Sequence, residues 1–184
     1  MYAREESEYF TAKRKAARQV IGDDRTRDLP SNKEIREEIL LLADMLEGEN
    51  RLRELTEIRV QALRIMRGLE RFRPRLLGSV LTGHIRKGSD VDLHVFTDSL
   101  GTLEEAIDAM GLSYNVEHKR VLKHGEQRVF THVHVEDRYR VELTVYPSDK
   151  VNYPFRSSIT GKEMERASIA ELEAMLRETA PDLE

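Results

Sequence analysis

The sequence predicts an α+β fold in which a mixed or antiparallel sheet packs on helices, with a helical extension before it and a helix after it. Apolar residues recur every three to four positions through the first half of the 184 residues, which is the period of a helix with one buried face. Beyond about residue 76 the period changes to two, which is typical of half-buried strands. Turn residues separate three consecutive strand-like segments, and such a run predicts antiparallel pairing.

Three helices are expected before residue 70. Residues 3–21 are charged with few apolar positions, which predicts a solvated or partner-facing helix. Ser31 and Glu34 have the spacing of a capping box, so a second helix should begin there. Two periodic apolar sets on either side of Gly48 predict two packed helices. These sets are Ile35, Ile39, Leu42 and Leu46, followed by Leu52, Leu55, Ile58, Ala62, Ile65 and Leu69.

The second half alternates as strands do. Leu76 and Leu77 end a short strand, and residues 90–96 place Val91, Leu93 and Val95 on one face. The antiparallel run that follows joins its strands by turns at 124–125 and 137–138. Its strands are expected at 113–122, 127–136 and 139–146.

Two further helices carry capping signatures. Thr102 to Glu105 predicts the start of one helix, which Gly111 should end. Ser168 to Glu171 predicts the start of the last helix. The expected organisation is therefore a helical extension over 1–50, a core over 51–150, and a loop and helix over 151–184.

Composition excludes several functional classes. Hydrophobic residues at 39% and charged residues at 35% are typical of a globular protein, and a net charge of −4 argues against a surface made for nucleic acid backbones. The chain has no cysteine, which removes disulfides, thiolate zinc sites and cysteine nucleophiles. No apolar run is long enough to span a bilayer. We therefore expect cytoplasmic residence.

The segment from Gly78 to Asp92 is the most informative for chemistry. Glycine lets backbone amides approach a phosphate, and a helix that begins just after Ser79 would direct its free N–H groups at the anion. Asp90 and Asp92 are two positions apart on a strand, so their carboxylates project from one face. Such a pair can share two hard cations that stabilise the oxygens of an in-line displacement at phosphorus.

This segment resembles the signature of the DNA polymerase β-like nucleotidyltransferases, a superfamily that includes bacterial proteins little larger than the core. A Gly-Ser pair, an internal glycine and Ser-Asp-x-Asp stand at the usual spacing. The resemblance covers about residues 60–146. It implies a nucleotidyltransferase fold, triphosphate binding at Gly78 and Ser79, metal binding at Asp90 and Asp92, and a third carboxylate on a later strand.

Glu142 is the best candidate for that third carboxylate. It lies mid-strand, on the face opposite to Val141 and Leu143. The competing residues Glu136 and Asp137 lie near a turn, where acidic residues are usually only solvated. The family more often has aspartate at this position.

The pairing of the last two strands predicts that two histidines lie on the same face as Glu142. If the apolar residues of 127–136 and 139–146 share a face, the intervening loop has an odd length. His132 and His134 then join Glu142 on the polar face, with His134 directly opposite Glu142 and its imidazole next to the carboxylate. His94 shares the face of the aspartates, where we expect a half-buried neighbour rather than a ligand.

Basic and hydroxyl side chains near the motif complete the expected site. Lys87 and Ser89 are predicted to contact the nucleotide, because both lie inside the phosphate loop region. Further cations are available at Arg86, Arg156, Lys162 and Arg166, each of which also fits a solvated surface. Residues 152–162 either cap the active-site cleft or simply cross the sheet to the last helix.

The leading hypothesis is a nucleotidyltransferase that uses two Mg²⁺ or Mn²⁺ ions to move a nucleoside monophosphate from a nucleoside triphosphate to an acceptor hydroxyl. The acceptor is left open among a small molecule, RNA and protein. The second hypothesis is an antitoxin or regulatory module of the same fold that acts on a partner protein, and the third is antibiotic adenylylation. A homodimer or a helical protein partner is compatible with the sequence, and no membrane partner is expected.

Overall fold

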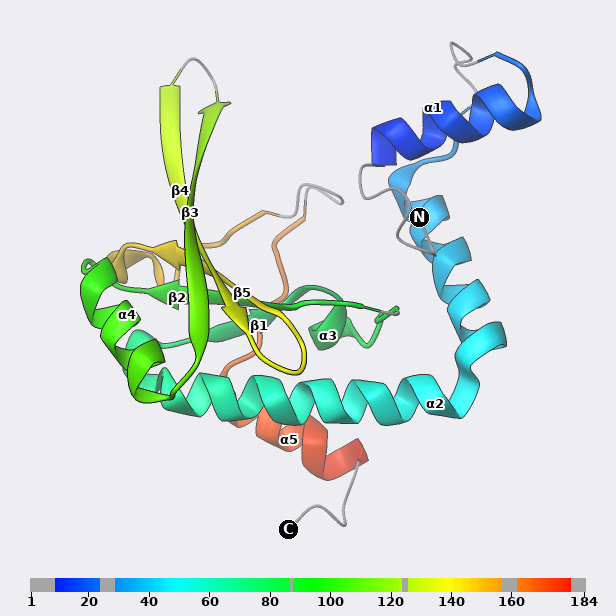
Figure 1. Ribbon diagram of the computed structural model, residues 1–184. Coiled ribbons are helices and arrows are strands. Elements are labelled where there is room, and N and C mark those ends of the chain that lie inside the picture. Colours follow the sequence, from blue (N-terminus) through cyan, green and yellow to red (C-terminus); the bar gives the residue numbers. More distant parts are fainter. Residues whose placement is uncertain (1–8, 24–28, 87, 124–125, 157–161, 180–184) are drawn as a thin grey trace.

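A five-stranded mixed sheet is the centre of the structure (Figure 1). The computed structural model describes residues 9–23, 29–86, 88–123, 126–156 and 162–179. The strands are β1 (Arg75–Leu77), β2 (Val91–Phe96), β3 (Ser113–Lys123), β4 (Glu126–Glu136) and β5 (Val141–Tyr146), in the spatial order β1-β2-β5-β4-β3. The predicted α+β class with a mixed sheet is confirmed.

The last strand of the sequence lies in the middle of the sheet. β5 pairs in parallel with β2 and antiparallel with β4, while β1 pairs antiparallel with β2 and β3 antiparallel with β4. The predicted antiparallel run of three strands is therefore confirmed. Its first turn, at 124–125, lies outside the described residues.

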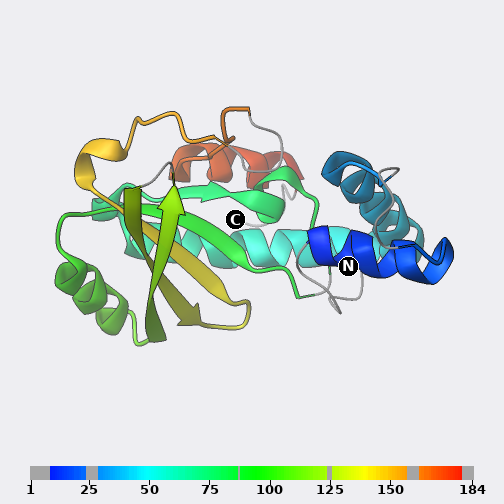
Figure 2. The ribbon, with the colours of Figure 1, turned by 90° about the horizontal axis from the view of Figure 1, so that it is seen from above.

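Helices cover one face of this sheet. The helices among the described residues are α1 (Tyr9–Val20), α2 (Asn32–Gly68), α3 (Gly78–Thr82), α4 (Leu100–Ala109) and α5 (Ile169–Thr179), with short 3₁₀ turns at Glu70–Phe72 and Ser148–Lys150. The second half of α2 runs along the sheet, and α5 packs beside it (Figure 2). The alternating residues Val91, Leu93, Val141 and Leu143 are buried in the core with Ile58 and Ile65 of α2. None of the described helices is long and apolar enough to cross a bilayer.

Helix α2 begins and bends at residues that the sequence identifies. Ser31 caps it, since the Glu34 N–H donates to the Ser31 hydroxyl at 3.1 Å and the Ser31 N–H donates to the Glu34 carboxylate at 2.7 Å. The prediction of two helices on either side of Gly48 is confirmed, because the backbone leaves the helical conformation at Gly48 and α2 consists of two helical segments that meet there. The two segments do not pack side by side, since the first turns away from the sheet (Figure 1). Gly48 has φ +44° and ψ −125°, a conformation open to glycine, so the chain turns there without a loop.

The two later helices test the other capping signatures. The predicted start of α4 at Thr102 was three residues late, because Ser99 is the cap and its hydroxyl accepts the Thr102 N–H at 3.4 Å. Gly111, with φ +69°, follows the end of α4 as expected. The Ser168 and Glu171 pair at the start of α5 is confirmed by reciprocal hydrogen bonds.

Strands β3 and β4 are longer than the rest of the sheet. Their pairing spans 113–123 and 126–136, whereas β5 reaches only as far as Thr131 on β4. The remainder forms a two-stranded ribbon that projects beyond the other strands (Figure 1).

Candidate active site

The sheet face opposite the core carries polar and aromatic side chains in three rows. We call it the site face. Residues paired across neighbouring strands point to the same side of a sheet. The first row contains Asp92, Glu142 and His134, the second His94, Thr144 and His132, and the third Phe96 and Tyr146. The rows place the predicted acidic residues at one end of the face and the aromatic rings at the other.

Asp92 and Glu142 are direct partners in this arrangement. They face each other across the parallel β2–β5 pair, so Glu142 lies on the same face of the sheet as Asp92. Asp90 lies just before β2 and is partly buried. Among the described residues, no three acidic or histidine side chains gather closely enough to form an ion site by themselves. The roles of Asp90, Asp92 and Glu142 as metal ligands stay a prediction.

Gly78 lies directly against the Asp92 carboxylate. It connects β1 to α3 with φ +73°, and a Cβ at this position would overlap Oδ2 of Asp92. Only glycine satisfies both requirements, because it has no Cβ and adopts positive φ without strain. Ser79 follows in the first turn of α3. The predicted Gly-Ser pair is thus positioned beside Asp92, while its contact with a phosphate stays a prediction.

The loop between α3 and β2 is held by Ser89. The buried Ser89 hydroxyl accepts the Arg86 N–H at 2.9 Å, and the Ser89 N–H donates to the Arg86 carbonyl at 2.9 Å. These bonds close a turn just before Asp90 and so fix where the acidic pair begins. The predicted nucleotide contact of Ser89 is not tested by them, and Lys87 lies outside the described residues.

Two buried arginines of α2 hold α3 in place. Arg59 donates to the carbonyls of Val80 at 3.0 Å and Leu81 at 2.8 Å, and Arg51 donates to the Gly83 carbonyl at 2.8 Å. These carbonyls end α3, where cations are favourable. The sequence does not indicate these two residues, because an arginine that caps a distant helix has no local signature.

His132, rather than His134, contacts Glu142. The predicted register is confirmed, with His134 directly opposite Glu142. The predicted contact between them was wrong, since His132 Nδ1 donates to Glu142 Oε1 at 2.6 Å and His134 Nε2 lies 3.2 Å from Glu117 Oε2. Long side chains reach diagonal neighbours on a sheet as well as direct ones. A diagonal contact from the second row therefore holds the Glu142 carboxylate.

Aromatic residues from the segment after β5 pack on the site face. Phe155 lies 4.9 Å from His94 and 4.4 Å from Tyr146, measured between ring centroids, and Arg166 lies over the Phe155 ring at 5.0 Å. Part of the stretch predicted over 152–162 thus touches the face that bears the acidic pair. Capping of a cleft by this stretch stays a prediction, because residues 157–161 lie outside the described ones.

His94 is more deeply buried than expected, with 4% of its surface exposed. Burial, together with smaller effects of the nearby Arg166 and His132, lowers the pKa of His94 to about 4. His94 is therefore neutral at physiological pH and serves as a packed ring in the aromatic group.

Stability should fall on acidification because of His94. Below about pH 6.5 the unfolded imidazole binds a proton that the folded one does not bind until about pH 4, so the free energy of unfolding decreases over that interval. Between about pH 7.5 and about pH 5 the His94 contribution to this loss is about 2 kcal/mol. Urea unfolding of wild type and His94→Phe at both pH values measures it. Equal losses in the two proteins would contradict the prediction.

Comparisons with known proteins leave the family open. No protein-family model matches the chain, and no curated protein matches it. One solved structure, of a cytoplasmic RNA terminal U-transferase, aligns with 62% of this chain at 19% identity and a TM-score of 0.35. The aligned region covers 35% of that protein's chain. A resemblance of this strength does not establish a shared fold.

Proposed function

We propose that this chain is a metal-dependent nucleotidyltransferase, which moves a nucleoside monophosphate from a nucleoside triphosphate to an acceptor hydroxyl and releases pyrophosphate. One observation carries the proposal. Asp92 and Glu142 are direct partners on parallel strands, and Gly78, at the start of α3, lies against the Asp92 carboxylate. An acidic pair beside a Gly-Ser turn is the arrangement that phosphoryl chemistry requires.

The donor set suits Mg²⁺ or Mn²⁺. Asp90, Asp92 and Glu142 offer only carboxylate oxygens, which are the ligands that these hard cations prefer. When bound, two such ions would neutralise phosphate charge and stabilise the attacking and leaving oxygens. Asp90 and Asp92 would hold both ions, and Glu142 would complete the site of the catalytic one.

The neighbours of these carboxylates have positioning roles. The N–H of His132 donates to Glu142 at 2.6 Å, which orients the carboxylate and leaves its second oxygen for other partners. In the proposed reaction Glu142 also accepts the proton of the acceptor hydroxyl. The missing Cβ of Gly78 leaves room for the Asp92 carboxylate beside the start of α3, so in the proposed site this carboxylate would lie close to a triphosphate bound there.

Metal dependence of nucleotide binding tests the proposal. Because the ions offset repulsion between carboxylates and phosphates, Mg²⁺ should lower the Kd of the preferred nucleoside triphosphate about tenfold or more. Calorimetric titration of each of the four nucleoside triphosphates, with Mg²⁺ or with EDTA, measures this change. The matching nucleosides, which lack phosphates, serve as controls and should bind equally in both buffers. Identical triphosphate titrations with and without metal would contradict a two-metal site.

A further inference from the structure

The first two helical segments project away from the sheet. Gly48 turns α2 so that residues 32–49 leave the core, and α1 lies across their far end (Figure 1). We call α1 together with residues 32–49 the N-terminal arm. Helices of 12 to 18 residues are only marginally stable in water without a packed face. The arm therefore needs a surface to pack on.

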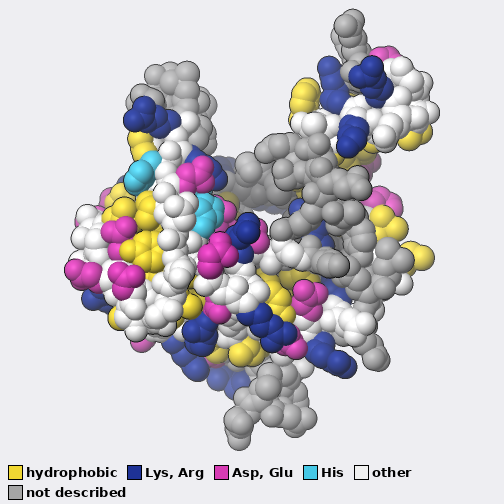
Figure 3. Space-filling model, viewed as in Figure 1, with side chains coloured by type: hydrophobic (Ala, Val, Ile, Leu, Met, Phe, Trp, Pro, Cys, Tyr) yellow, Lys and Arg dark blue, Asp and Glu magenta, His cyan; other side chains and the backbone are white. Residues whose placement is uncertain are grey.

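Exposed apolar residues concentrate on this arm. Five of the ten large hydrophobic side chains that are exposed among the described residues belong to it. Met45 is 83% exposed and Leu41 57% exposed. The five residues are Phe10, Val20, Leu41, Leu42 and Met45. Figure 3 shows yellow apolar side chains on the surface of the arm. Such a concentration marks an interaction surface, whereas scattered single exposures are ordinary.

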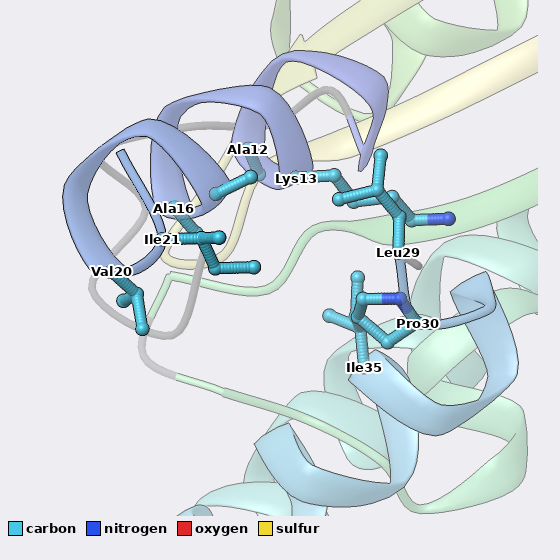
Figure 4. Close-up of a pocket in the computed structure, with 9 residues that line it drawn as sticks. Ala12, Lys13, Ala16, Val20, Ile21, Leu29, Pro30 and Ile35 are labelled. Carbon is cyan, nitrogen blue, oxygen red and sulfur yellow. The ribbon is translucent and has the colours of Figure 1, made fainter. Parts of the chain in front are cut away.

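Within one chain, α1 lies next to the beginning of α2. An apolar cavity of about 350 Å³ lies between them and is lined by Ala12, Ala16 and Val20 of α1 and by Leu29, Pro30 and Ile35 (Figure 4). The exposed residues Leu41, Leu42 and Met45 lie one to three turns farther along α2. The apolar face of the arm is thus incompletely covered by its own chain.

The two parts of the arm carry opposite charges. The sequence of α1 has four basic residues, Lys13, Arg14, Lys15 and Arg18, and no acidic one. Residues 32–49 contain six acidic and two basic residues. Each chain therefore carries both halves of a complementary pair, a basic apolar helix and an acidic apolar helix.

We propose that the arm is a dimerisation surface, on which α1 of one chain packs against residues 37–49 of a second copy. A two-fold axis repeats each contact, so the basic helix of each chain meets the acidic helix of its partner. The same interface covers Leu41, Leu42 and Met45 in both chains. This proposal is independent of the catalytic one.

The oligomeric state of the full chain tests the surface. Sedimentation equilibrium should show a dimer, and Leu41→Glu with Met45→Glu should raise the dimer dissociation constant at least tenfold. Val60→Glu is the matched control, since Val60 is 44% exposed on α2 but lies outside the arm. A wild-type chain that is monomeric at every concentration would overturn the proposal, as would a dimer that survives the double substitution.

Charge reversal distinguishes contacts between chains from contacts within one. Lys15→Glu with Arg18→Glu makes α1 acidic in one variant, and Glu37→Lys with Glu38→Lys makes α2 basic at this position in another. Each variant alone should dimerise at least tenfold more weakly than wild type, and an equimolar mixture should regain a dimer that contains one of each chain. Failure of the mixture to associate would show that the opposite charges do not meet between chains, and would overturn the proposed packing.

Discussion

Glu142→Gln should reduce nucleotidyl transfer at least a hundredfold while metal–nucleotide binding stays within about tenfold of wild type, or about 1.4 kcal/mol. The substitution keeps the size of the side chain and its ability to accept a hydrogen bond from His132, but it removes the charge that holds the proposed catalytic ion. Asp92→Asn should differ, because Asp92 would be shared by both ions. It should weaken nucleotide binding as well as transfer.

Single-turnover transfer and calorimetric binding, measured on the same preparations, separate these two effects. Glu136→Gln is the matched control, since Glu136 is an exposed glutamate near the turn that leads to β5. Its transfer and binding should equal those of wild type. Wild-type transfer by Glu142→Gln would mean that another residue is the third carboxylate, or that the chain acts as a binding module.

Gly78→Ala should reduce nucleotidyl transfer nearly as much as Glu142→Gln does, because it changes the geometry of the site without changing a charge. The new Cβ would overlap Oδ2 of Asp92, and φ +73° is strained for alanine. We expect a loss of about 1–3 kcal/mol in the free energy of unfolding. We also expect at least a hundredfold loss of transfer, because a shift of about 1 Å in a positioned group costs that much.

Gly101→Ala provides the control for this substitution. Gly101 lies in α4 with nothing within 4 Å of the position its Cβ would take, and its φ is not positive. Alanine there should leave transfer unchanged and raise helix stability by up to about 1 kcal/mol. Urea unfolding and transfer assays on both variants make the comparison. Equal transfer in Gly78→Ala and wild type would show that Gly78 does not determine the position of Asp92.

Local rules made much of this fold predictable. The Ser31 and Ser168 caps depend on residues three positions apart, and strand alternation placed Glu142 on the face opposite to the buried residues Val141 and Leu143. The apolar residues of β4 and β5 must share one face of the sheet, and this requirement was enough to predict that His134 pairs with Glu142. In each case the deciding residues are neighbours in sequence or are related by the two-residue period of strands.

The features that were missed depend on how distant segments meet. His132 contacts Glu142 because a long side chain can reach a diagonal neighbour on the sheet. The strand register does not determine which neighbour is reached. Arg59 meets α3 only because α2 packs beside it, and Phe155 reaches His94 from a segment without periodic structure. The direction in which the chain turns at Gly48 could not be predicted, because a glycine between two apolar sets is compatible with many bend angles.

The central place of β5 has a consequence for how the protein is made. A chain synthesised only as far as residue 140 can pair β1 with β2 and β3 with β4, but the strand that pairs with both β2 and β4 is then missing. Asp92 gains its partner when 141–146 inserts between them, a contact that spans 50 positions of sequence and is slow to form for that reason. The acidic pair is therefore completed by the same step that completes the sheet, and an unfinished chain presents Asp92 without Glu142.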